Sequence, residues 1–437
     1  MLIKLNRFII KDLFRRCSIF LLLTLLQFNA LAQDNLYARY TTTEAKNKTL
    51  KNLINYTIYK NLSLPLSDST EENWSEAFAA LELLLYKNSA INRKIDNAIA
   101  SMELRSESFQ RSLLELAYTN YSGVYTIQIT SLLKSTGNAK IFAMCAEYIL
   151  QRNTDSVQIR KIEELMSIKF PDKSDPIIAM LAEHISQIKL PSGSLVHNKF
   201  FVDLLNKNFL SREIVMYSFQ RKDRNYPGLV LIRNAAGKFI RDTTGKIFNV
   251  PQLARSITNL PGYLTNGNTP QGIFKMYGFG VSSSAFIGPS PNIQMAMPGE
   301  MNLQKFFRDT TLRDSVWSKD VYGSLLPKNL REYKPLFHSY YAGLAGRTEI
   351  ISHGTAIDPE YYKGQPYYPH TPSAGCLSTK EIWNGRRIES NQKKLIEALL
   401  KAGGADGYCV VVDLDDKKSA VTIKEILPLL LKAESVK

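Results

Sequence analysis

The chain has 437 residues, and its 55 Lys and Arg against 40 Asp and Glu give a formal net charge of +15. The length predicts two or three domains, and an apolar fraction of 44% excludes a disordered polyelectrolyte. A basic protein suits an anionic polymer or membrane surface, or has a basic exterior without a dedicated partner. Because the sequence holds no nucleic-acid-binding motif, we expect no nucleic acid among its partners.

Residues 1–32 have the order of a secretory signal peptide. Five basic residues precede the apolar run Ser18–Phe28, and the small-residue sequence Ala30-Leu31-Ala32 follows. That run is far shorter than the roughly 20 residues that span a bilayer. We therefore expect cleavage after Ala32, export to the periplasm or cell envelope, and no stable membrane span afterwards; an uncleaved anchor is the alternative. Cleavage removes five basic residues and one acidic residue, so +15 becomes +11.

Residues 33–195 predict an all-α domain, because apolar side chains recur there at helical spacing between short polar turns. This pattern favours a helical bundle or a short solenoid, although no clean sequence repeat is present. The domain leaves open an envelope protein as a partner. The clearest predicted helices are Glu107–Tyr118, Ala139–Gln151 and Gln158–Ile168.

The pattern changes near residue 210, and residues 210–416 predict a mostly β domain. Residues 285–345 are rich in Pro and Gly, which is typical of an inserted loop or lid. Residues 417–437 predict a C-terminal helix, centred on Ile423–Ala433. The predicted fold class is thus a multidomain α+β protein. The predicted strands are Ile214–Phe219, Gly228–Ile232, Glu349–Ser352 and Tyr408–Leu414.

Three cysteines remain after the expected cleavage, and an odd number leaves at least one free thiol. Cys145 lies in an apolar helical pattern and Cys409 in a strand-like run, so both are expected to be small buried side chains. Cys376 differs, because it follows Ser373-Ala374-Gly375 in a turn-forming sequence. It is therefore the candidate reactive thiol.

A base for this thiol is available in His353, 23 residues earlier at the end of an apolar run. A thiol near neutral pH is mostly protonated, and a neighbouring imidazole can accept its proton so that the thiolate attacks a carbonyl carbon. His370 competes for this role, being six residues before Cys376. The alternative is a structural His353 that only ends a strand. Three metal ligands at ordinary spacing are not visible, so we expect no metal and no cofactor.

Three sequence motifs together resemble the catalytic family of L,D-transpeptidases (YkuD-like). They are the turn Thr269–Phe274, the strand end His353-Gly354-Thr355, and Ser373-Ala374-Gly375-Cys376. The resemblance covers about residues 210–415 and implies a mostly β catalytic domain that acts on peptidoglycan stem peptides. It assigns the nucleophile to Cys376 and the base to His353, with Ser373 and Gly375 in the family motif.

The chain departs from the family at two positions. Ala374 stands where the family usually has His, and Ser378 stands where it usually has Arg or Asn. We expect His370 to replace the first side chain in space, and Arg386 or Arg387 to supply a cation for a substrate carboxylate. Gly354 and Thr355 are expected to line the site, and Tyr368 belongs to a Tyr-rich stretch suited to clamping a glycan or peptide.

Other functions remain open at this point. The same Cys and His could release a terminal residue to water, as an L,D-carboxypeptidase would. A His-Gly followed by Gly-Cys also occurs in caspase-like peptidases, although the loop 358–372 leaves no room for their crossover helix. Papain-like hydrolases place Cys before His, opposite to this chain. The changes at Ala374 and Ser378 also suit a catalytically degenerate scaffold protein of the envelope.

Overall fold

The computed structural model describes residues 36–172, 174–189, 198–313 and 315–435. The expected signal peptide lies outside these residues. The described chain contains many helices and one large mixed sheet, so the predicted α+β class is confirmed.

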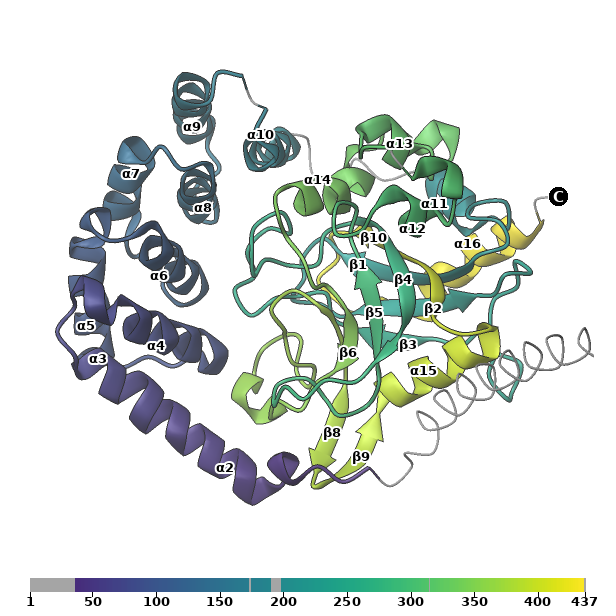
Figure 1. The fold of residues 1–437 in the computed structure, drawn as a ribbon, viewed down its shortest axis with the longest axis horizontal. Helices are drawn as coiled ribbons and strands as arrows, with labels where there is room; N and C mark the ends of the chain where they lie inside the picture. The colour runs from purple at the N-terminus through teal and green to yellow at the C-terminus, as the bar shows by residue number, and fades with distance from the viewer. Residues whose placement is uncertain (1–35, 173, 190–197, 314, 436–437) are drawn as a thin grey trace, which may run out of the picture.

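The first part of the chain is helical, and its helices stack side by side in an arc around the sheet-containing part (Figure 1). Contacts run mainly between near neighbours, such as α4 with α6, α6 with α8 and α8 with α10. This arrangement is that of a short solenoid rather than a closed bundle. The helices are α2 (Thr43–Asn52), α3 (Asn61–Ser63), α4 (Glu71–Leu84), α5 (Ser89–Ala100), α6 (Glu107–Asn120), α7 (Thr126–Ser135), α8 (Ala139–Leu150), α9 (Ser156–Lys169) and α10 (Pro176–Ile188).

Local sequence explains where these helices begin. Asn88, Ser106, Asn138 and Asp175 precede α5, α6, α8 and α10, and each side chain accepts a backbone N–H of the first turn. Such capping satisfies amide groups that have no partner within the helix. The apolar faces meet in one continuous core, and all residues of α8 from Ile141 to Leu150 are buried.

The second part of the chain is built on an eight-stranded sheet. Its spatial order is β3-β2-β1-β10-β4-β5-β6-β7. The pairs β1–β10 and β6–β7 are parallel, and the others are antiparallel. The strands are β1 (Ile214–Arg221), β2 (Gly228–Arg233), β3 (Val250–Gln252), β4 (Gly272–Gly280), β5 (Asn292–Ala296), β6 (Ser352–Gly354), β7 (Leu377–Thr379) and β10 (Asp406–Asp415); β8 (Glu381–Asn384) and β9 (Arg386–Ser390) form a separate hairpin.

Helices cover both faces of this sheet. Along β1, Tyr217 and Phe219 face a core shared with α11 and α16, whereas Met216 faces a core shared with α15. This alternation is that of a strand buried on both sides. The second part of the chain is therefore one large sheet between helices, with a small separate hairpin, and is less β-rich than the resemblance implied. The helices are α11 (Asn198–Leu205), α12 (Leu303–Phe307), α13 (Lys319–Gly323), α14 (His338–Leu344), α15 (Asn391–Ala402) and α16 (Ile423–Ser435).

Two sequence ranges differ from the expectation. The strand predicted at Glu349–Ser352 was wrong, because β6 starts only at Ser352. Glu349 has a positive φ of 62°, a left-handed conformation that interrupts an extended strand. The range 285–345 begins inside the sheet, since it contains β5; the rest of it carries α12, α13 and α14.

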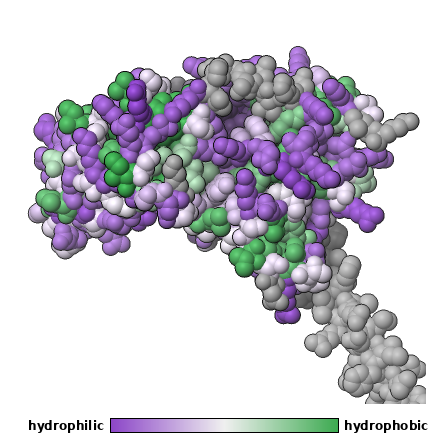
Figure 2. Space-filling model, turned by 90° about the horizontal axis from the view of Figure 1, so that it is seen from above, coloured by the Kyte–Doolittle hydropathy of each residue, from purple (hydrophilic) through white to green (hydrophobic). Residues whose placement is uncertain are grey.

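The surface is mostly hydrophilic on the face shown in Figure 2, where apolar residues appear only in small separate groups. Large apolar side chains lie mainly in four buried clusters. Within the described residues, no helix is long and apolar enough to cross a membrane.

Candidate active site

The turn that carries Cys376 is shaped by the side chain of Ser373. The Ser373 hydroxyl donates to the Cys376 carbonyl at 2.9 Å and accepts the Gly375 N–H at 3.1 Å. A single hydroxyl therefore closes the turn from within. The Ser373 carbonyl in turn accepts the Ile257 N–H at 2.8 Å, which fastens the turn to a neighbouring loop.

Gly375 is required for this turn. Its φ is +118°, and a Cβ at this position would overlap the Arg347 guanidinium and the Gly267 carbonyl oxygen. Both the backbone conformation and the close approach exclude a larger residue. The Thr269 hydroxyl donates to the Gly375 carbonyl at 2.8 Å, so two of the three motifs that carry the resemblance are in direct contact.

His353 lies on β6, beside the strand that Cys376 precedes. In the parallel β6–β7 pair, Ser352 is opposite Leu377 and His353 is opposite Ser378. Side chains alternate between the faces of a strand, so His353 and Ser378 share one face. Cys376 is two residues before Ser378 and is expected on this same face. The third motif is thus next to the other two.

A hydrogen bond sets the tautomer of His353. Its Nδ1 lies 2.7 Å from the Gly354 carbonyl oxygen, and since a carbonyl only accepts, Nδ1 must carry the proton. Nε2 is then left with a free lone pair when the ring is neutral. Burial lowers the pKa of His353, and the Gly354 bond opposes this only in part. The buried imidazole is accordingly a neutral base near pH 7.

The Cys376 thiol is partly exposed and is protonated in its surroundings. Its Sγ–H donates to the Glu349 carbonyl at 3.4 Å, and no hydrogen bond joins it to His353 among the described residues. Burial raises the thiol pKa; the Ile351 N–H and the Arg347 charge lower it, and the carboxylates of Glu349 and Glu300 raise it. The Cys376 amide donates no hydrogen bond within the described residues, so it is available to an oxyanion.

Arg347 is a residue of this site that the sequence did not reveal. It is 5% exposed, and its guanidinium donates to the carbonyls of Gly262, Gly267 and Asn268, the last at 2.6 Å. Burial lowers its pKa to about 10, which leaves it charged near neutral pH. Nothing in the local sequence Gly346-Arg347-Thr348 indicates this role, because the acceptors come from a loop about 80 residues earlier.

His370 is not brought to the thiol. Its ring is buried, and both ring nitrogens lack a hydrogen-bond partner within the described residues. Burial lowers its pKa to about 4, and the charges that act on it are those of Lys380 and Glu389. The structure therefore favours His353 over His370 as the base. Tyr368 is 39% exposed and donates to Glu360 at 2.8 Å.

The remaining predicted residues lie at or beyond the other end of β6 and β7. Gly354 faces Glu381, whose carboxylate leaves no room for a Cβ. Thr355 accepts a hydrogen bond from the Thr371 hydroxyl at 2.7 Å. Arg386 and Arg387 belong to β9, which follows the carboxyl end of β7, whereas Cys376 precedes its amino end. Neither arginine is thus beside the thiol, and Arg387 instead donates to Ser290 at 3.0 Å.

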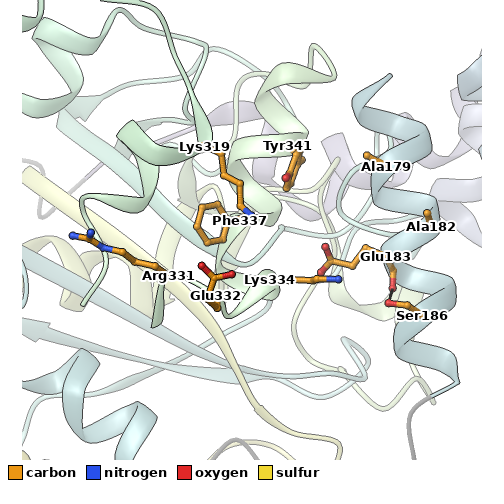
Figure 3. Close-up of a pocket in the computed structure, with 10 residues that line it drawn as sticks. All are labelled: Ala179, Ala182, Glu183, Ser186, Lys319, Arg331, Glu332, Lys334, Phe337 and Tyr341. Atoms are coloured by element: carbon orange, nitrogen blue, oxygen red, sulfur yellow. Dashed lines mark hydrogen bonds between the residues drawn. The ribbon is translucent and has the colours of Figure 1, made fainter. Parts of the chain in front are cut away.

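A cavity of about 280 Å³ lies elsewhere, between α10 and the segment that carries α13 and α14 (Figure 3). Ala179, Ala182, Glu183 and Ser186 line it from α10, opposite Lys319, Arg331, Glu332, Lys334, Phe337 and Tyr341. It contains no residue of the Cys376 turn. We place the reactive site at the thiol on the basis of its chemistry and not at this cavity.

No protein-family model matches the sequence, and the comparisons with curated proteins and with solved structures give no match either. Within the described residues, no three His, Cys, Asp or Glu side chains are grouped to hold a metal ion. The residues of the site itself therefore carry what can be said of its chemistry.

Proposed function

We propose that this protein is an exported cysteine acyltransferase of the L,D-transpeptidase type that acts on peptidoglycan stem peptides. The observation that carries the proposal is the meeting of three distant motifs. Thr269 contacts Gly375, and His353 lies on β6, which pairs with the strand β7 that Cys376 directly precedes. Structural turns alone give no reason for a partly exposed free thiol and a neutral, oriented imidazole to lie at neighbouring strands.

The proposed reaction begins with transfer of the Cys376 proton to Nε2 of His353. The thiolate then attacks the carbonyl carbon of the diamino acid, at its L-configured centre, in the donor stem. The Cys376 N–H stabilises the oxyanion that forms. His353 returns the proton to the amine of the departing terminal D-residue as the C–N bond breaks. An acceptor amine then attacks the thioester while His353 accepts the proton that the amine loses. The thiolate leaves as the C–S bond breaks, and it recovers the proton from His353, which completes the transfer. Water in place of the amine would give a carboxypeptidase.

The segment that follows β5 is proposed to cover the bound stem as a lid. It leads through α14 directly into Arg347 and Glu349, both of which act on the thiol. A rearrangement of the segment would therefore move Arg347 and Glu349 and so change the surroundings of the Cys376 thiol. The helical domain is proposed to contact an envelope partner.

A second candidate is a non-catalytic envelope scaffold. The observation in its favour is the thiol itself, which bonds to Glu349 rather than to His353 and has a raised pKa. The catalytic proposal requires a rotation about the Cys376 side chain when substrate binds. Hydrogen bonds of a catalytic pair often tighten only in the substrate complex.

The first prediction separates these candidates. The protein is incubated with purified muropeptides that differ in stem length, and the products are identified by mass spectrometry. Cross-linked products that disappear in Cys376→Ala would establish transfer, whereas shortened stems alone would establish hydrolysis. Loss of activity should be complete, because the other two cysteines of the described residues, Cys145 and Cys409, are buried in apolar cores.

The matched control is Cys409→Ala. Cys409 lies in β10, fully buried, and burial raises its pKa, so its removal should leave the products unchanged. Absence of any Cys376-dependent product across all stem types, in a protein that remains folded, would refute the enzyme proposal and leave the scaffold.

A further inference from the structure

We propose that Arg347 is the positioning residue of the nucleophile, holding the Cys376 turn and placing a fixed positive charge beside the thiolate. This inference deepens the proposed function and rests on the same thiol. It concerns how the thiol is made reactive, and its test requires no knowledge of the substrate.

The Arg347 side chain packs against the turn that carries Cys376. The Arg347 guanidinium fills the space that a Cβ on Gly375 would occupy, so it packs directly against the residue before Cys376. The same guanidinium donates to the carbonyls of Gly262, Gly267 and Asn268. A planar guanidinium with several fixed donors can hold three acceptors at once, whereas a lysine ammonium cannot match that geometry.

The charge of Arg347 acts on the Cys376 thiol. The charged groups that act on the Cys376 thiol are Arg347, Glu349 and Glu300, together with the Ile351 amide dipole. Of these charged groups, all of which belong to the described part of the chain, Arg347 alone is a cation. Because it is buried, water screens its charge only weakly. A positive charge favours the thiolate over the thiol, so Arg347 opposes both the carboxylates and the effect of burial.

The loop that Arg347 binds is also held by the helical domain. Residues 260–268 reach into the helical domain, where Leu260, Tyr263 and Leu264 join its apolar core. The Asn266 amide donates to Glu115 on α6 at 3.0 Å. One face of the loop is thus fixed by the helices and the other by Arg347. The guanidinium connects the helical domain to the nucleophile turn.

The test measures alkylation of Cys376 by iodoacetamide as a function of pH, with quantification by mass spectrometry of the peptide that carries this cysteine. In Arg347→Met the midpoint of the rate profile should move to higher pH, because the thiolate loses its stabilising cation. At pH 8 we expect alkylation roughly tenfold slower than in the wild type. Arg347→Lys should lie between the two.

The matched control is Arg255→Met. Arg255 is also a buried cation, in the segment just before that loop, and donates to the carbonyls of Ser256 and Ile257, but its charge does not act on Cys376 among the described groups. Its loss should lower the unfolding temperature without moving the midpoint. Equal shifts in both variants would mean that loop disorder is the cause, which would overturn the proposal.

An unchanged midpoint in folded Arg347→Met would overturn the proposal as well. If that variant does not fold, Gly375→Ala provides the second test, since its Cβ displaces the guanidinium; a midpoint at or below that of the wild type would then count against the proposal. These outcomes are independent of muropeptide turnover. The proposed function can therefore fail while this inference stands, and the reverse.

Discussion

At the residue scale, the turn Ser373–Cys376 depends on one hydroxyl. Ser373 bonds both the amide of Gly375 and the carbonyl of Cys376, so the turn is fixed before any substrate arrives. Preorganisation of this kind lowers the free energy needed to align a nucleophile. The sequence motif identified Ser373, but only the structure assigns it to the backbone of the turn rather than to the thiol.

This assignment predicts the effect of Ser373→Ala. Loss of the two hydrogen bonds should lower the free energy of unfolding by about 1–2 kcal/mol, and the loosened turn should also slow alkylation of Cys376. Ser378→Ala is the matched control, because its hydroxyl makes one buried bond, to the Thr371 carbonyl at 2.8 Å, and shapes no part of the turn. Chemical denaturation and the iodoacetamide rate check both variants; an unaltered rate in Ser373→Ala would contradict the role of the hydroxyl.

At the element scale, the sequence predicted long elements well and short ones poorly. The helices predicted at Glu107–Tyr118 and Ala139–Gln151 match α6 and α8 within two residues, and the strand predicted at Tyr408–Leu414 lies within β10. Each has a long periodic apolar face, which is a local property. The helix α15 could have been found from its two ends, since Ser390 caps its start and Gly403 ends it.

The short elements of the site follow other rules. β6 and β7 have three residues each, too few to show a period. Where β6 begins depends on Glu300, whose carboxylate accepts the Glu349 N–H at 2.6 Å across about 50 residues of sequence. Arg347 likewise finds its acceptors through long-range contacts. Positions fixed by distant partners leave no local pattern to read, so the thiol and imidazole were predictable while their surroundings were not.

The helices of the solenoid rest on their caps, and α8 provides a test. Asn138 accepts the N–H groups of Lys140 and Ile141 at 3.0 and 3.2 Å. Asn138→Ala should therefore lower the free energy of unfolding by about 1 kcal/mol. Asn97→Ala is the control, because Asn97 is exposed within α5 and alanine is the better helix former there. Urea denaturation compares the two; equal stabilities would contradict the capping role.

At the scale of the whole molecule, the helical arc and the sheet domain meet at a buried carboxylate. Glu147, on α8, is 2% exposed. It accepts the Tyr263 hydroxyl from the loop of the sheet domain at 2.5 Å, and it contacts His184 Nδ1 on α10 at 2.6 Å. A carboxylate this deeply buried needs such partners. Because that same loop carries the acceptors of Arg347, the carboxylate supports the arrangement around Cys376 from a distance.

This contact predicts how stability depends on pH. Burial lowers the pKa of His184, but the charge and the hydrogen bond of Glu147 outweigh it and raise the pKa above the ordinary 6.5. A raised histidine pKa contributes stability that is fully present below pH 6.5 and is lost as the pH rises through the folded-state pKa. The melting temperature should therefore fall as the pH rises from neutrality into the mildly alkaline range, and His184→Gln should reduce that fall.

The control for this experiment removes the other partner of the carboxylate. Tyr263→Phe deletes a neutral donor and leaves the His184–Glu147 pair in place, so it should lower the melting temperature by a similar amount at every pH. Calorimetry of the wild type and both variants across this range separates the two effects. A wild-type slope that persists in His184→Gln would contradict the assignment of the pH dependence to this pair.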